Sequence, residues 1–149
     1  MEINSINKIL KCAAVTMLGE AEELKSKVLA ETARLVKEQK LSSKVIDGEN
    51  GFYALCHITK ENETIKEISF NEQCVIGRSN SLNPLDITTN DKWLSKTHFK
   101  IFVNADGVPF IEDLESRNGT YVNDIKIQES KLLHRGDCIR AGHSIFIFL

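Results

Sequence analysis

Three polar clusters in the second half of the chain combine charged and neutral hydrogen-bond donors. They are Gly77-Arg78-Ser79, Ser95-Lys96-Thr97-His98 and Ser116-Arg117-Asn118-Gly119-Thr120. An arginine guanidinium offers a fork of N–H donors that matches a phosphate group, and a serine hydroxyl can add a short hydrogen bond. A phosphate ester carries roughly −1.5 to −2 charges and three strong acceptor oxygens, so several loops are needed to surround it. The clusters therefore predict a site for a phosphorylated ligand.

A hydrolytic site is the competing interpretation, because Ser95 and His98 could be a nucleophile and its base. The G-x-S-x-G nucleophile elbow is absent, and no motif places an acidic partner. A phosphate-cradling G-x-x-x-x-G-K-[S/T] loop is also absent. The chain has no C-x-x-C pair, and His57, His134 and His143 are scattered. We therefore expect no enzyme activity, no cofactor and no metal site.

The elements that must position these clusters are short strands. From Phe52 onward, runs rich in β-branched and aromatic residues alternate with turns. The predicted strands are 53–58, 64–70, 73–76, 99–103, 110–113, 120–122, 125–127 and 144–148. Turns are expected at 61–63, and Asp106-Gly107 and Asn123-Asp124 favour tight hairpins because these residues tolerate positive φ. So many short strands over about 100 residues indicate an all-β sandwich.

Residues 5–40 differ from the rest of the chain in composition, and their residue types predict a helix. They are rich in Ala, Leu, Glu and Lys and contain no proline, although Gly19 interrupts the run. Apolar residues follow one stripe at steps of four and three, with one position missing: Leu10, Ala14, Met17, Ala21, Leu24, Val28 and Leu35. Such a helix can pack on its own domain, on a second copy or on another protein. The turn-forming residues after Leu41 place the boundary between a helical segment at 1–45 and a β domain at 46–149.

In order and spacing, the polar clusters resemble the forkhead-associated (FHA) family. The family pattern is Gly-Arg, then Ser-x-x-His, then Ser-x-Asn-Gly-Thr with an Asn three residues beyond the Thr. The matching residues are Gly77, Arg78, Ser95, His98, Ser116, Asn118, Gly119, Thr120 and Asn123, and the tail agrees at Leu133, Gly136, Asp137, Ile139 and Gly142. The resemblance covers about residues 52–149. The sequence departs from the family at Asp124, where glycine is common, although aspartate also suits a tight turn.

The resemblance implies a fold and a role for each matched residue. The fold is an FHA-type sandwich of two antiparallel sheets, preceded here by the N-terminal helical segment. The phosphopeptide-binding residues would be Arg78, Ser95, Lys96, Arg117 and Asn118. Residues that support the binding loops would be Gly77, His98, Gly119, Thr120 and Asn123. Trp93, just before the second cluster, could either cover the edge of the core or line a specificity surface.

Two functions follow from the resemblance. The first is a signalling adaptor that binds phosphothreonine-containing proteins in a Ser/Thr kinase pathway, with residues 1–45 as a docking or oligomerisation segment that could form a homo-oligomer. The alternative is a scaffold for assembly that uses the sandwich and the helix without binding phosphate. Discrimination of phosphothreonine from phosphoserine is implied by the family alone.

Composition limits the other classes of partner. The net charge is −2 and 42% of the residues are hydrophobic, so the chain can build a core but offers no strongly basic surface for nucleic acid. The apolar stretch at 12–18 is too short to span a bilayer, and no secretory signal is evident. We expect no nucleic-acid partner, no membrane association and a cytoplasmic location.

Overall fold

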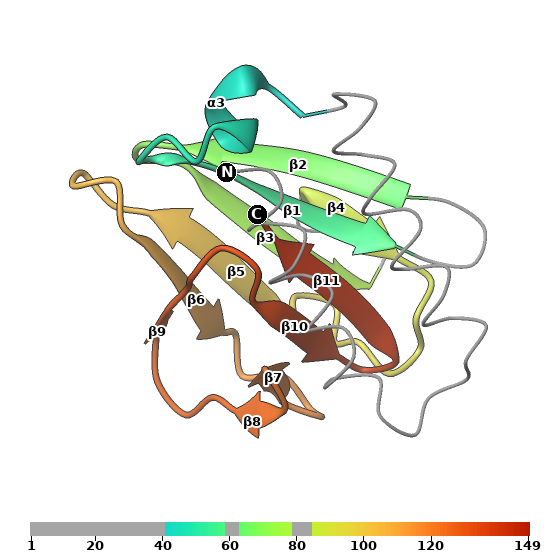
Figure 1. The fold of residues 1–149 in the computed structure, drawn as a ribbon. Helices are drawn as coiled ribbons and strands as arrows, with labels where there is room; N and C mark the ends of the chain where they lie inside the picture. Colours follow the sequence, from blue (N-terminus) through green and yellow to red (C-terminus); the bar gives the residue numbers. More distant parts are fainter. Residues whose placement is uncertain (1–40, 59–62, 79–84) are drawn as a thin grey trace.

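The computed structural model of the protein describes residues 41–58, 63–78 and 85–149. This part of the chain is almost entirely β-structure (Figure 1). Its elements are α3 (Ser43–Ile46), β1 (Phe52–Ile58), β2 (Glu63–Ser69), β3 (Gln73–Arg78), β4 (Ile87–Thr89), β5 (Phe99–Val103), β6 (Pro109–Asp113), β7 (Thr120–Val122), β8 (Ile125–Lys126), β9 (Lys131–Leu132), β10 (Cys138–Ala141) and β11 (Ser144–Phe148). The predicted helix of residues 5–40 and the predicted turn at 61–63 lie wholly or largely outside the described residues.

The strands form two sheets that pack as a sandwich. The six-stranded sheet has the order β2-β1-β11-β10-β7-β8, and the five-stranded sheet has the order β4-β3-β5-β6-β9. The prediction of wholly antiparallel sheets is wrong at one pair, because β4 runs parallel to β3. Parallel neighbours need a crossover connection instead of a hairpin. Here the chain between Arg78 and Ile87 makes that connection, and its central residues, 79–84, lie outside the described part.

The predicted tight hairpin at Asn123-Asp124 is confirmed by the backbone, whereas Asp106-Gly107 lies in a longer connection, residues 104–108, between β5 and β6. Asn123 and Asp124 have φ angles of 51° and 67°, and Val122 faces Ile125 across the two-residue loop. Positive φ at both central residues is the signature of the hairpin turn that matches the twist of the flanking strands. Aspartate at position 124 therefore supplies the conformation for which the family usually has glycine.

The main core lies between the sheets and follows the period-two pattern of each strand. Leu55, Phe146 and Phe148 point inward from the six-stranded sheet, and Phe99 and Ile101 point inward from the five-stranded sheet. The rings of Phe99 and Phe146 meet edge to face at 5.3 Å between centroids, which joins the two layers. Because β5 begins at Phe99, this packing fixes the strand that immediately follows the second polar cluster.

A second apolar cluster covers the other face of the six-stranded sheet. Ala54 and Cys56 from β1 and Ile145 and Ile147 from β11 contribute to it, and all of β11 is buried. The complete cluster consists of Leu41, Val45, Ala54, Cys56, Cys138, Ile145, Ile147 and Leu149. Leu41 and Val45 therefore attach α3 to the sheet. The division of the chain at residue 45 remains a prediction.

Burial of His57 gives the fold a pH dependence. The imidazole is stacked on the ring of Phe146 at 4.6 Å, and burial lowers its pKa below the usual value although Asp91 acts in the opposite direction. The folded state therefore binds this proton less readily than the unfolded state, so stability should fall as the pH decreases below about 6.5. Denaturant unfolding from pH 8 to pH 5 should show this loss, and His57→Phe should reduce it. An unchanged pH profile in the variant would contradict the assignment.

Within the described ranges, no helix has the length and apolar character that a membrane crossing requires.

Candidate functional site

Three loops at one end of the sandwich surround a cavity of about 420 Å³. The chain leaving β3, the β4–β5 loop and the β6–β7 loop each contribute to its lining. All five residues predicted to bind phosphopeptide line this cavity: Arg78, Ser95, Lys96, Arg117 and Asn118. The remaining lining residues are Lys92, Trp93, Leu94, Thr97, Leu114 and Glu115. Residues separated by about 40 positions in the sequence thus meet at one rim.

Gly77 permits the first two loops to approach each other. The strand β3 continues through Gly77 and Arg78, two residues beyond its predicted end. A Cβ atom at Gly77 would lie 2.1 Å from the backbone oxygen of Lys96, which is far inside contact distance. The Arg78 amide donates to the Ser95 carbonyl oxygen at 2.9 Å, so the backbone of the second loop lies directly against β3. Only glycine leaves room for this contact.

The Ser95 side chain joins the second loop to the third. Its Oγ accepts a hydrogen bond from the backbone N–H of Arg117 at 3.0 Å. An oxygen that accepts in this way keeps its own hydroxyl hydrogen to donate elsewhere. The Asn118 Nδ2 atom donates to the Trp93 carbonyl oxygen at 2.9 Å, which ties the same two loops a second time. Ser95 and Asn118 are therefore both lining residues and loop connectors.

His98 braces the same loops from inside the core. The side chain is completely buried, its Nδ1 accepts from the Ser95 amide at 3.0 Å, and its Nε2 lies 2.9 Å from the Gly119 carbonyl oxygen. An Nδ1 atom that accepts a hydrogen bond carries no proton, so the Nε2 atom must carry it and donate to Gly119. The geometry specifies the neutral Nε2–H tautomer. In this geometry His98 fixes the distance between the second and third loops.

Asp113, at the end of β6, organises the third loop. Its carboxylate accepts hydrogen bonds from the Ser116 amide at 3.0 Å and from the buried Thr120 hydroxyl at 2.6 Å, and Ser116 Oγ also donates to it. The Gly119 amide in turn donates to Ser116 Oγ at 3.0 Å, and Gly119 adopts a φ of 84°. Burial acts to raise the pKa of Asp113, but the hydrogen bonds outweigh it and hold the pKa below its usual value. Its contribution to stability is therefore complete above about pH 4 and is lost as the pH falls through the lowered pKa.

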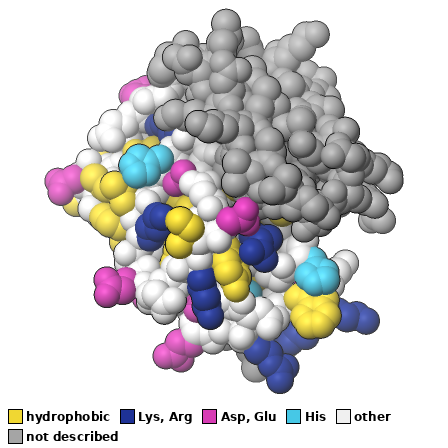
Figure 2. Space-filling view, turned by 60° about the horizontal axis from the view of Figure 1, so that its bottom comes forward, with side chains coloured by type: hydrophobic (Ala, Val, Ile, Leu, Met, Phe, Trp, Pro, Cys, Tyr) yellow, Lys and Arg dark blue, Asp and Glu magenta, His cyan; other side chains and the backbone are white. Residues whose placement is uncertain are grey.

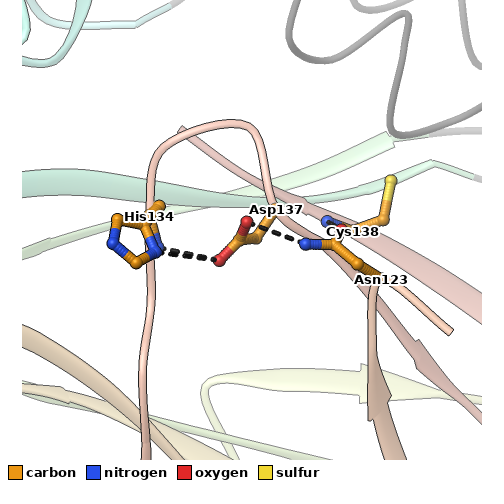
Figure 3. Close-up of polar contacts among 4 residues, drawn as sticks. All are labelled: Asn123, His134, Asp137 and Cys138. Atoms are coloured by element: carbon orange, nitrogen blue, oxygen red, sulfur yellow. Dashed lines mark hydrogen bonds and ion pairs between the residues drawn. The ribbon is translucent and has the colours of Figure 1, made fainter. Parts of the chain in front are cut away.

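Asn123 fixes the turn after the third loop, as Figure 3 shows. Its Nδ2 donates to Asp137 Oδ1 at 3.0 Å, and its Oδ1 accepts from the Cys138 amide at 3.0 Å. The His134 amide donates to the other oxygen of Asp137 at 2.8 Å. Asn123 therefore connects the β7–β8 turn to the segment that enters β10. It does not line the cavity.

The cavity has an excess of positive charge. Arg78, Lys92, Lys96 and Arg117 line it, against the single carboxylate of Glu115. Within the described part of the chain, no salt bridge involves any of these four cations. Figure 2 shows Lys and Arg side chains gathered at one margin of the visible surface, near a histidine that lies against a hydrophobic side chain. The site offers hydrogen-bond donors and unneutralised positive charge, which is the chemistry that a phosphate group requires.

The described residues do not assemble another kind of reactive centre. Among them, no group of three His, Cys, Asp or Glu side chains is placed to hold a metal ion. The His98 ring uses both of its nitrogens in loop bonds, so it is not positioned as a base for Ser95. Within the described residues, the arrangement contains no complete catalytic constellation.

Several residues of the site were missed in the sequence. Asp91 lies in the β4–β5 loop and Asp113 ends β6, and each accepts a hydrogen bond from a backbone amide two or three residues later. Such local bonds are typical of Asp at turns, and that signal was available. Lys92 carried no signal, because only the folded loop brings it to the rim. The contact of Trp93 with His143 joins residues 50 positions apart and could not be found in the sequence.

Comparison with known proteins agrees with this geometry. Residues 74–142 match the family model of the FHA domain. No protein of curated function matches the chain's sequence. Among solved structures, the FHA domain of the CT664 protein from Chlamydia trachomatis superposes with a TM-score of 0.60 at 24% identity, covering 66% of this chain and 96% of that one.

Two further structures are similar. The FhaA FHA domain, solved in complex with the intracellular domain of Rv3910, has a TM-score of 0.56 and 27% identity over 65% of this chain and 99% of that one. EmbR from Mycobacterium tuberculosis, solved with a low-affinity phosphopeptide, has a TM-score of 0.55 and 25% identity over 83% of this chain and 31% of that one. The chain is therefore similar to the FHA domain over residues 74–142, and the similar solved structures contain FHA domains.

Proposed function

We propose that this protein is an adaptor that binds phosphothreonine-containing proteins in Ser/Thr kinase signalling. One observation carries the proposal. Four cations and the Ser95 hydroxyl converge from three loops on one cavity that holds a single carboxylate, Glu115, and none of the four cations forms a salt bridge within the described residues. Positive charge gathered around a small polar cavity attracts an anion, and a dianionic phosphate is the ligand that matches both the charge and the donors.

Each lining residue has a role in this proposal. Arg78 supplies the guanidinium fork and Ser95 the hydroxyl donor to the phosphate oxygens. Arg117 and Lys96 add positive charge from the two neighbouring loops. Asn118 holds the main chain of the peptide, since an amide side chain both donates and accepts. The supporting residues, which are Gly77, His98, Gly119, Thr120 and Asn123, keep the three loops at the required separation.

Similar proteins support the class of ligand. EmbR was solved with a phosphopeptide, and the FhaA FHA domain was solved with an intracellular domain of another protein. A further FHA structure, 27% identical over 65% of this chain, was reported in a study of phosphothreonine-dependent FHA domain interactions. We extend this ligand class to the present chain because its own loops supply the donors.

The affinity should be modest. Each hydrogen bond to a charged group contributes about 1.5–3 kcal/mol. Two or three such bonds, less the entropy lost on ordering a peptide, give a dissociation constant on the order of micromolar. An adaptor of this affinity responds to kinase activity reversibly. The predicted helical segment at 1–45 would dock the domain on a partner or a second copy, and the cytoplasmic location also remains a prediction.

A titration with matched peptides tests the function. Phosphothreonine, phosphoserine and unmodified threonine versions of an oriented peptide library are titrated against the whole chain, with fluorescence or calorimetry as the readout. We expect binding of the phosphothreonine form on the order of micromolar and at least tenfold weaker binding of the unmodified form. Equal binding of the two forms would instead support the phosphate-independent scaffold. Weaker binding of phosphoserine would demonstrate the threonine preference directly.

A further inference from the structure

Trp93 and His143 form an exposed aromatic platform beside the cavity. The indole and imidazole rings are stacked at 5.1 Å between centroids and 11° between planes. Trp93 nevertheless keeps 55% of its surface exposed, so the stacking does not bury it. The expectation that Trp93 covers the edge of the core is wrong, because a large indole surface faces solvent. Tryptophan is among the residues that contribute most to binding at protein interfaces.

Asp91 holds this platform in place. Its Oδ1 accepts from the Trp93 amide at 2.9 Å, and its Oδ2 accepts from the His143 amide at 2.7 Å and from Ser144 Oγ at 2.8 Å. One carboxylate thus joins the β4–β5 loop to the β10–β11 turn. A Cβ atom at Gly142 would lie only 3.0 Å from Asp91 Oδ2 and from the Trp93 carbonyl carbon, so the turn and the loop are in close contact. A surface fixed before the ligand arrives loses little entropy on binding.

The platform continues the rim of the phosphate cavity. Trp93 lines that cavity, and its carbonyl oxygen accepts the hydrogen bond from Asn118, the residue assigned to the peptide main chain. Ser95 follows two residues later in the same loop. A peptide whose phosphate sits between Arg78 and Ser95 and whose backbone passes Asn118 therefore has a neighbouring side chain within reach of the indole.

We propose that the Trp93–His143 platform selects targets with an apolar, preferably aromatic, side chain close to the phosphothreonine. This proposal rests on the proposed function and names the class of peptide that the same site prefers. The flat, uncharged indole surface offers contact area, and aromatic pairs add to the energy of area burial. The cations around the cavity act on the phosphate, whereas the platform acts on the flanking residue, so affinity and selectivity have separate sources.

The test compares selectivity instead of affinity alone. Peptides with a fixed phosphothreonine carry Phe, Leu or Gly at each flanking position in turn, and the ratio of dissociation constants, Gly peptide over Phe peptide, is measured at the best position. For the unmodified chain we expect a ratio of about five- to tenfold. Trp93→Ala should reduce this ratio to about one, and Trp93→Phe should retain part of it. His143→Ala, which removes the support, should lower the ratio by about twofold or more.

Controls separate this proposal from the function on which it rests. Leu132→Ala removes another exposed apolar side chain, on β9 and outside the cavity, and should keep the full ratio. Thermal unfolding of each variant establishes that it is folded. If phosphothreonine peptides bind but every flanking residue gives the same affinity, or if Trp93→Ala keeps the ratio, the platform is only a surface brace and the proposal fails alone. If no phosphopeptide binds the unmodified chain, both proposals fail.

Discussion

Replacing Arg78 by alanine should weaken phosphopeptide binding by roughly 10- to 150-fold, which would abolish it in practice at micromolar affinity. The guanidinium is the group at the cavity best able to form two parallel hydrogen bonds to phosphate. Its side chain takes part in no salt bridge within the described residues, so its removal leaves no buried charge without a partner. The fold should therefore survive, since the strand contact of this residue is made by its backbone amide.

Two comparison variants make the Arg78 experiment specific. Arg78→Lys keeps the charge but loses the planar fork, so it should fall between the wild type and alanine. Lys131→Ala removes one positive charge on β9, outside the cavity, and should bind like the wild type. Calorimetric titration with a phosphothreonine peptide measures all three. If Lys131→Ala loses as much affinity as Arg78→Ala, then Arg78 contributes only through the overall charge of the protein.

His98→Ala should damage both stability and binding. The substitution leaves a cavity in the core and removes the partners of the Ser95 amide and the Gly119 carbonyl oxygen. Loss of a buried side chain together with unsatisfied backbone groups should lower the free energy of unfolding by about 2–5 kcal/mol. Because His98 sets the separation of two binding loops, affinity should fall at least tenfold even at temperatures where the variant is folded.

Denaturant unfolding and peptide titration together measure this effect. His134→Ala removes an exposed imidazole and should change neither quantity appreciably, because the loop bond at that position is made by the backbone amide. A stable His98→Ala variant that binds with wild-type affinity would show that the loops hold their positions without the buried ring. A variant that is destabilised but binds normally when folded would restrict His98 to a role in folding.

Much of the fold could be predicted because short-range sequence patterns specify its strands and turns. Strands such as β5 and β11 carry a clear run of apolar residues. The residue types of the Asn123-Asp124 turn predict its positive φ angles. The strands β4 and β9 have only three and two residues and, unlike the equally short β7 and β8, are not joined by a tight turn such as Asn123-Asp124 that would mark them. The parallel pairing of β4 with β3 depends on where the connecting chain travels, and local residue types do not specify that.

The candidate site likewise contains residues that the sequence predicted and residues that it did not. Arg78, Ser95 and Asn118 were predicted because their spacing matches a known pattern, and the structure brings them to one cavity. The carboxylates that position the loops were missed. Asp91 acts on His143, which lies far along the chain, and Asp113 acts through the hydroxyls of Ser116 and the buried Thr120. Spacing identifies groups that touch a ligand more readily than the network that holds them.

The apolar layer on the outer face of the six-stranded sheet bears on how the domain should be produced in isolation. A shortened protein that begins at β1 would lack Leu41 and Val45. The side chains of Ile145, Ile147 and Leu149 would then be exposed to solvent. An exposed apolar sheet surface of that kind promotes non-specific self-association, which could be mistaken for oligomerisation of the whole chain. Fragments that retain Leu41 and Val45 are therefore better suited to measuring how many copies of the chain associate.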